Sequence, residues 1–233
     1  MIPKNPLSRR NFMSLAGATG AVVMAGCSKP DQPKTDIITP VEILARHHGA
    51  IYRAVAVLEE IRGGMNARMD LPPEMIGGTV EIIRTFVMDI HQQMEEKYIF
   101  PVFDAQGKMS GLVGVLREQH AAGARLIEIL RGLCDGFSAK DLEKRRTMAS
   151  AIHLLSRMCR AHAEWEDTAL FPLLRSIVPP KSFAELSSVL YRTESELLGQ
   201  NGFDETIRKL NGYENILGIG DLASYTPRAE DLS

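Results

Sequence analysis

The sequence has few aromatic residues and no excess of positive charge. Aromatic side chains make up 6% of its 233 residues, whereas β-sheets are enriched in aromatic and β-branched residues. Leu, Met, Ala, Glu and Arg dominate the long segments instead, and these residues favour helices. The formal net charge is −2, and no basic stripe of the kind that binds nucleic acid is present. The sequence therefore predicts a helical protein and no nucleic-acid partner.

The N-terminal region lacks an apolar run long enough to span a membrane. Residues 13–24 form an apolar stretch of 12 residues, whereas a transmembrane helix needs about 20. The preceding Ser-Arg9-Arg10-Asn-Phe resembles the twin-arginine export signal. The Met-Ala-Gly-Cys27 that follows resembles a bacterial lipobox, although such boxes usually have Leu in place of Met. We therefore expect residues 1–26 to be an export signal and Cys27 to be lipidated. The alternative is a cleaved signal with an incidental cysteine.

The segment after this cysteine is predicted to be a tether. Residues 27–39 are polar and contain prolines, which is typical of an extended linker. Lipoproteins of this kind have more than one acyl chain, so their attachment to a membrane surface is stable. We expect a protein exported by the twin-arginine route that becomes a periplasmic or cell-surface lipoprotein.

The remaining chain shows helical periodicity. Apolar or small residues recur at alternating spacings of four and three, as on the inward face of a helix bundle. This pattern predicts an all-α, antiparallel four-helix bundle over residues 40–179. Prolines and glycines set the expected helix limits, which are about 40–63, 73–101, 110–136 and 138–179. Residues 180–233 are predicted to be a short helical C-terminal extension with a packing or docking role.

Polar residues interrupt the inward faces of these helices in a repeated pattern. His91-x-x-x-Glu95 and His162-x-x-x-Glu166 are each followed by Phe-Pro at matching positions. A lone histidine precedes each motif, His48 by 43 residues and His120 by 42. The bundle is therefore predicted to be a duplicated helix pair.

These residue types at this spacing suit a pair of metal ions. Positions i and i+4 lie on one face of an α-helix, so each motif presents an imidazole and a carboxylate to one point. Four histidines and two carboxylates inside a bundle would otherwise be costly unpaired polar groups. The mixed nitrogen and oxygen set contains no thiolate and fits iron or manganese better than structural zinc. Because carboxylates can bridge two ions, we expect Glu95 and Glu166 to be the bridging ligands.

Each of these residues also has a plainer interpretation. A lone inward histidine is more often a hydrogen-bonded core residue, and a lone His-x-x-x-Glu motif commonly forms a surface pair. Two copies with matched spacing make the metal interpretation the stronger one. His47 lies about 100° from His48 and is expected on the flank or exposed, whereas His153 is expected to face away from the site.

The duplicated motif with its trailing Phe-Pro resembles the hemerythrin-like, or HHE cation-binding, family over about residues 40–176. Residues 198–203 and 217–227 also resemble the C-terminal extension of some bacterial members. The resemblance implies a four-helix bundle with a non-haem di-iron centre. Blood-pigment hemerythrins use five histidines, one Glu and one Asp, whereas four histidines and two glutamates here argue against simple reversible oxygen carriage. The Glu-x-x-His pattern of ferritin-like proteins is absent.

Two tyrosines are expected just outside the ligands. By α-helical geometry, Tyr98 lies on the same face as His91, and Tyr52 lies one turn beyond His48. Packing is the favoured role for both. The sharper hypothesis is a phenol that donates a hydrogen bond or an electron at the centre.

Three functional hypotheses follow from the sequence. The favoured one is a di-iron protein, with manganese as the alternative metal, that binds or senses O2 or NO. The second is a redox enzyme that consumes peroxide or NO or delivers iron for repair. The third is a metal-stabilised scaffold. No general base, phosphate-binding loop or second cofactor motif supports turnover of an organic substrate, so a ligand-binding protein is preferred over an enzyme.

Overall fold

A computed structural model describes residues 38–67, 72–135, 138 and 140–228. The predicted export signal with Arg9, Arg10 and Cys27, and most of the predicted tether, lie outside the described residues. Within them every regular element is a helix. None of these helices combines the length and apolar character needed to cross a membrane.

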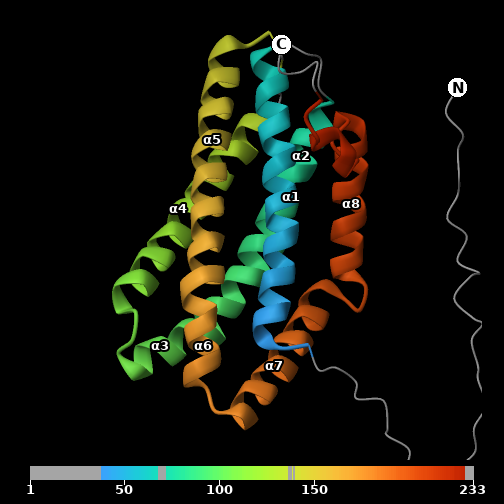
Figure 1. Cartoon of the computed structure of the whole chain (residues 1–233). Coiled ribbons are helices and arrows are strands. Elements are labelled where there is room, and N and C mark those ends of the chain that lie inside the picture. Colours follow the sequence, from blue (N-terminus) through green and yellow to red (C-terminus); the bar gives the residue numbers. More distant parts are fainter. Residues whose placement is uncertain (1–37, 68–71, 136–137, 139, 229–233) are drawn as a thin grey trace, which may run out of the picture. The chain divides into compact units, whose positions relative to one another are not determined.

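Four long helical rods form the bundle. The first is α1 (Pro40–Asn66), and the third is α4 (Ser110–Cys134). The second and fourth rods each join α-helical and π-helical segments end to end. These segments are α2 (Pro73–Ile82), η1 (Ile83–Gln92), η2 (Glu95–Ile99) and α3 (Phe100–Gln106), and then α5 (Leu142–Trp165), η3 (Glu166–Leu170) and α6 (Phe171–Ile177). Successive rods run in opposite directions (Figure 1), which confirms the predicted antiparallel four-helix bundle.

The helix ends follow local sequence signals. Thr39 and Glu42 form a capping box, in which the Thr39 backbone N–H donates to Glu42 Oε2 at 2.7 Å and the Glu42 N–H donates to Thr39 Oγ1 at 3.3 Å. The second rod was predicted to end at Pro101, but it continues to Gln106. A proline normally clashes with the carbonyl four residues earlier, and the wider π-helical turn of η2 accommodates Pro101.

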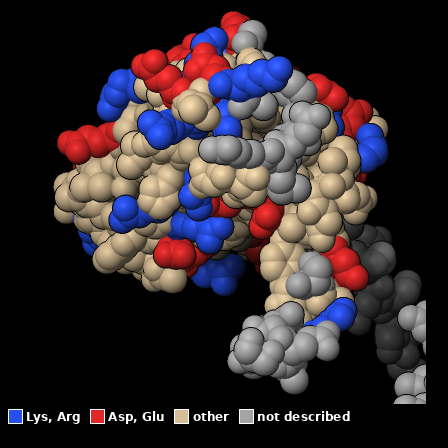
Figure 2. Space-filling model, turned by 90° about the horizontal axis from the view of Figure 1, so that it is seen from above, with Lys and Arg blue, Asp and Glu red and all other residues tan. Residues whose placement is uncertain are grey.

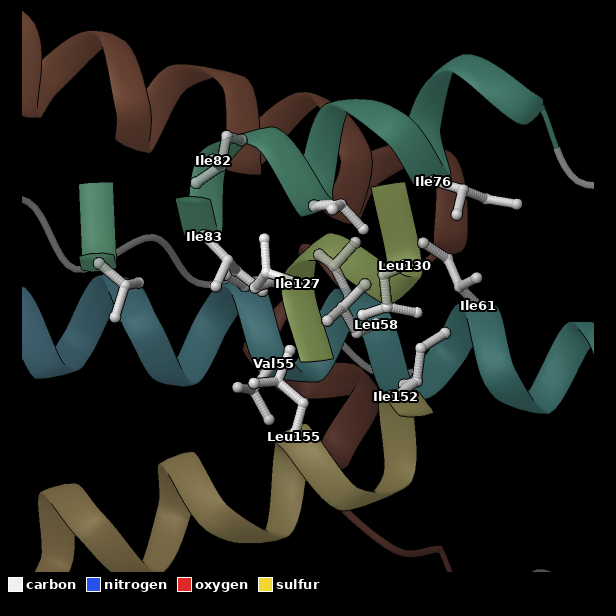
Figure 3. Close-up of a cluster of buried hydrophobic side chains, with 14 of the residues drawn as sticks. Val55, Leu58, Ile61, Ile76, Ile82, Ile83, Ile127, Leu130, Ile152 and Leu155 are labelled. Carbon is white, nitrogen blue, oxygen red and sulfur yellow. The ribbon is translucent and has the colours of Figure 1, made fainter. Parts of the chain in front are cut away.

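Apolar side chains fill the bundle on both sides of a polar layer, which is formed by the six candidate ligands His48, His91, Glu95, His120, His162 and Glu166. One core cluster is formed mainly by α1, α2, η1, α4 and α5, and includes Leu58, Leu130 and Ile152 (Figure 3). A second cluster is built around Phe100 and Phe171. Along every rod the candidate ligands lie between residues of the two clusters. The fold therefore encloses the polar layer from both ends.

The C-terminal extension packs against α1. It consists of α7 (Pro180–Leu198), α8 (Gly202–Leu217) and a short 3-10 turn, η4 (Leu222–Tyr225). Both α7 and α8 contact α1. Their contact buries His47 completely, at 0% exposure. The expectation that His47 lies on the flank or exposed is therefore wrong, because the extension covers the side of α1 that the bundle leaves open. His153 is exposed, as predicted.

Candidate metal centre

The structure brings all six predicted ligands together in the polar layer. His48 comes from α1, His91 and Glu95 from the second rod, His120 from α4, and His162 and Glu166 from the fourth rod. All six are buried, with exposures between 0% and 8%. Two overlapping groups have ligand atoms within 4.8 Å of one another. These groups are His48, His91, Glu95 and Glu166, and then Glu95, His120 and His162.

Each carboxylate lies between a histidine of one half and a histidine of the other. Glu95 Oε1 is 3.2 Å from His91 Nε2, and its Oε2 is 3.4 Å from His120 Nε2. Glu166 Oε2 is 3.3 Å from Nε2 of both His48 and His162. All four imidazoles thus present Nε2 to the centre. Each carboxylate is therefore close to one histidine of either half, and the bridging role that the sequence predicts for Glu95 and Glu166 stays a prediction.

The donor atoms fit a metal pair. His48 Nε2, His91 Nε2 and all four carboxylate oxygens of Glu95 and Glu166 are buried without a hydrogen-bond partner among the described residues. Unpaired buried polar atoms are costly, and cations satisfy imidazole nitrogens and carboxylate oxygens together. Cys159 lies beside the site, but burial raises the pKa of its thiol to about 12. The set therefore consists of nitrogen and oxygen donors, which suits iron or manganese.

Three of the four histidines form hydrogen bonds through Nδ1 to residues that the sequence analysis missed. His48 Nδ1 is 2.9 Å from Asp167 Oδ1, and His120 Nδ1 is 2.9 Å from Glu96 Oε1. His162 Nδ1 is 2.9 Å from Gln119 Oε1. Such partners fix the imidazole tautomer and orientation. The signal was present in the sequence, because Glu96 and Asp167 directly follow the ligand carboxylates at matching places in the repeat.

The phenylalanine of each Phe-Pro motif packs against a histidine of the other half. Phe100 of the first half stacks on His120 of the second, with ring centroids 5.5 Å apart. Phe171 of the second half stacks on His48 of the first at 5.4 Å. Each half of the repeat therefore positions the lone histidine of the other half.

Burial and mutual charge set the protonation of the metal-free centre. Burial lowers the pKa of His91 well below its usual value, and the neighbouring histidines lower it further. Burial also disfavours charge on His48, but the hydrogen bond to Asp167 and the nearby carboxylate of Glu166 outweigh it and raise the His48 pKa to about 9. For the coupled carboxylates, burial and the charge of Glu166 raise the pKa of Glu95. Burial opposes ionisation of Glu166 too, but the imidazoles of His162 and His48, with Nε2 atoms 3.3 Å from Oε2, lower its pKa to about 2.

π-Helical turns occur at the same place in both halves. η2 begins at Glu95 and η3 begins at Glu166. Single π-helical turns within helices are rare and often mark functional sites. Here both begin at the glutamate of a His-x-x-x-Glu motif, so the irregularity belongs to the duplicated motif.

Comparisons with known proteins agree with this geometry. The family described as "Hemerythrin HHE cation binding domain" matches residues 39–174. The chain belongs to the hemerythrin HHE cation-binding family. Uncharacterized proteins of Mycobacterium tuberculosis and Mycobacterium bovis are 30% identical to it over 237 residues, which cover 97% of this chain and 93% of each relative. No solved structure gives a significant match.

The two tyrosines of this HHE protein lie in different places. The Tyr52 ring is 6.4 Å from the His48 ring, close to the predicted position. Thr193 of α7 donates to the Tyr98 hydroxyl at 3.5 Å, so Tyr98 faces the extension instead of the centre. The prediction for Tyr98 assumed α-helical rotation from His91. The intervening π-helical turns rotate less per residue and bring Tyr98 to another face.

A small cavity adjoins the HHE site. It is lined by His48, His91 and His162 together with less polar neighbours, which include Ile51, Val87, Met158 and Cys159. Its volume is about 20 Å³, and a cavity needs about 10–15 Å³ to hold one water molecule. There is room for one molecule of a few atoms beside the histidines.

Proposed function

We propose that this protein is a non-haem di-iron protein that binds or senses a small diatomic ligand, O2 or NO. The supporting observation is the cluster of six buried candidate ligands beside a cavity of about 20 Å³, in which His48, His91, Glu95 and Glu166 present atoms without a hydrogen-bond partner. Two iron ions would be held by His48 with His91 and by His120 with His162, with Glu95 and Glu166 between them. Manganese fits the same donors and is the alternative metal.

Residues around the candidate ligands orient them for metal binding. Asp167, Glu96 and Gln119 orient three imidazoles, and Phe100 and Phe171 restrict two of them. Iron supplies the electrons and open coordination positions that binding of a diatomic ligand requires. The volume of the cavity, about 20 Å³, suits a ligand of a few atoms better than an organic substrate, which favours binding or sensing over turnover of a larger molecule.

The test uses the full chain loaded anaerobically with Fe²⁺. We expect about two irons per chain in the wild type and one or none in His91→Ala. His153→Ala is the matched control, because this histidine is exposed on α5, and it should retain both irons. Full iron content in single-alanine variants of all six ligands would contradict the site.

Exposure of the loaded protein to O2 or NO under an optical spectrometer then separates the functions. A spectral change that reverses on removal of the gas supports binding or sensing. An irreversible change with consumption of the oxidant, or of peroxide, identifies a redox enzyme. The absence of any spectral change from a fully iron-loaded protein leaves the scaffold hypothesis.

We also propose that the protein acts outside the cytoplasm as a membrane-attached lipoprotein. This proposal depends on Arg9, Arg10 and Cys27 in the sequence. Mass spectrometry of the membrane fraction tests this proposal, because a chain beginning at an unmodified residue other than Cys27 would contradict lipidation.

The surface charge bears on a different partner, nucleic acid. On the face seen from above, basic and acidic side chains alternate (Figure 2), so this face offers no continuous basic surface to nucleic acid.

A further inference from the structure

The four ligand histidines are not supported alike. His48, His120 and His162 each have a hydrogen-bond partner for Nδ1 within the bundle. His91 Nδ1 is fully buried and has no partner among the described residues. Metal-binding histidines almost always use their second ring nitrogen for an outer contact, so the surroundings of His91 require an explanation.

The ring beside His91 is His47, which the bundle alone would leave uncovered. The two rings meet edge to face, with centroids 5.5 Å apart. His47 is itself buried at 0% exposure, and its Nδ1 also lacks a partner among the described residues. Phe86 of the second rod and Phe203 of α8 pack against the same ring, at 4.9 and 6.0 Å. His47 is therefore a fixed polar ring placed directly behind a metal ligand.

A carboxylate of the C-terminal extension holds His47 in this position. Glu194 of α7 is 7% exposed, and its Oε2 is 2.6 Å from His47 Nε2. Arg46 donates to both oxygens of Glu194, at 2.8 and 2.6 Å. The same guanidinium lies 4.2 Å from the Phe203 ring centroid. Two elements of the extension thus converge on the histidine that contacts His91.

We propose that Glu194 and His47 are positioning residues for His91, so that the C-terminal extension completes the support of the metal centre. This inference rests on the proposed metal site. The matched HHE domain ends at residue 174, and the mycobacterial relatives align over 97% of this chain. The extension is therefore part of what is shared with these relatives. Asp167, Glu96 and Gln119 bind their histidines directly, whereas Glu194 binds His47, whose ring packs against His91. Loss of such an outer contact lowers metal affinity by about 10- to 100-fold.

The chain contains a matched control for this carboxylate. Glu214 of α8 is also 7% exposed and pairs with an α1 arginine, Arg53, as Glu194 pairs with Arg46. Arg53 also donates to Asn211 Oδ1, so this cluster is built around the arginine. Removal of either carboxylate weakens the docking of the extension, but only Glu194 is linked to a ligand histidine.

The experiment measures Co²⁺ binding to the full chain by its visible absorption, which reports coordination geometry. In Glu194→Ala we expect one of the two ions to bind about 10- to 100-fold more weakly and its absorption band to shift. Glu214→Ala should bind both ions as the wild type does. His47→Phe keeps an aromatic ring and the Arg46–Glu194 pair, so it should reproduce the effect of Glu194→Ala in a chain whose extension stays docked.

Three outcomes would overturn the inference, and they can be told apart. If folded His47→Phe binds Co²⁺ with unchanged affinity and spectrum, the positioning role is wrong while the proposed metal site stands. This result is decisive even if Glu194→Ala fails to fold. An equal loss in Glu214→Ala shows that docking of the extension, and not the contact with His47, is responsible. Failure of the wild type to bind two ions removes the proposed centre and this inference together.

Discussion

Metal affinity should depend on pH in a range where ordinary histidines no longer titrate. The hydrogen bond to Asp167 and the nearby Glu166 carboxylate outweigh burial and raise the His48 pKa to about 9 in the metal-free protein, whereas an unperturbed histidine has a pKa of about 6.5. His48 must lose its proton before Nε2 can bind a metal. We therefore expect affinity for the ion at His48 to rise about tenfold per pH unit between pH 7 and 8.5, or about 1.4 kcal/mol per unit.

The stability of the metal-free fold should change in the opposite direction. Because the folded-state pKa of His48 lies above the unfolded value, its protonation stabilises the metal-free protein fully below about pH 6.5. That contribution is lost as the pH rises through about 9. Histidines with a lowered pKa, such as His91, have the opposite effect near pH 6.5, where the unfolded chain still binds their protons. Chemical unfolding of metal-free protein at pH 7.5, 8.0 and 8.5 should therefore show a declining free energy of unfolding while metal affinity increases.

Calorimetry in two buffers with different ionisation enthalpies counts the protons released. At least one proton should leave for each chain that binds metal at pH 7.5. Asp167→Asn removes the negative charge near His48 Nδ1, so the His48 pKa should fall and the rise in affinity should shift to lower pH. Affinity that is flat from pH 7 to 8.5 in the wild type, with no proton release, would refute the assigned protonation of His48.

Three further predictions concern stability and export. Chelation of the metal should lower the melting temperature, because unpaired donors then remain buried, and excess Fe²⁺ should restore it; equal melting temperatures of both forms would contradict a coupling of metal binding to folding. Leu58→Ala in the core should cost about 2–5 kcal/mol in chemical unfolding, whereas Leu154→Ala, with a side chain 51% exposed, should stay within about 0.5 kcal/mol. Replacement of both Arg9 and Arg10 by Lys should leave iron-loaded protein in the cytoplasm, and normal export of that variant in cell fractionation would contradict a twin-arginine signal.

The clustering of the six candidate ligands could be predicted from the sequence because their pattern is local and repeated. His91 and Glu95 are one helical turn apart, so their proximity depends only on a helix. The repeat then relates them to His162 and Glu166 without any knowledge of how the helices cross. The same repeat also contained Glu96 and Asp167. Their role was missed because each serves a histidine of the opposite half, and this crossing is a property of the packed bundle.

Predictions that depended on uniform α-helical rotation were less successful. Tyr98 was placed by its seven-residue distance from His91, and the π-helical turns between them change that relation. Tyr52, on the regular helix α1, lies close to where it was expected. Periodicity thus predicts positions well along an uninterrupted α-helix and poorly across a segment whose hydrogen bonding changes at the functional site.

The burial of His47 shows a different limit of sequence reasoning. A helical projection assigns a residue to a face, but it does not say which element covers that face. For α1, one side meets the bundle and another meets α7 and α8, and the contact of His47 with Glu194 joins residues 147 positions apart. The duplicated motif is nearly symmetric in its ligands, yet the main contacts of α7 and α8 with the bundle are made to α1 and α2, which belong to its first half. The two metal positions should therefore differ in affinity, with the ion at His48 and His91 being the one that responds to changes in the extension.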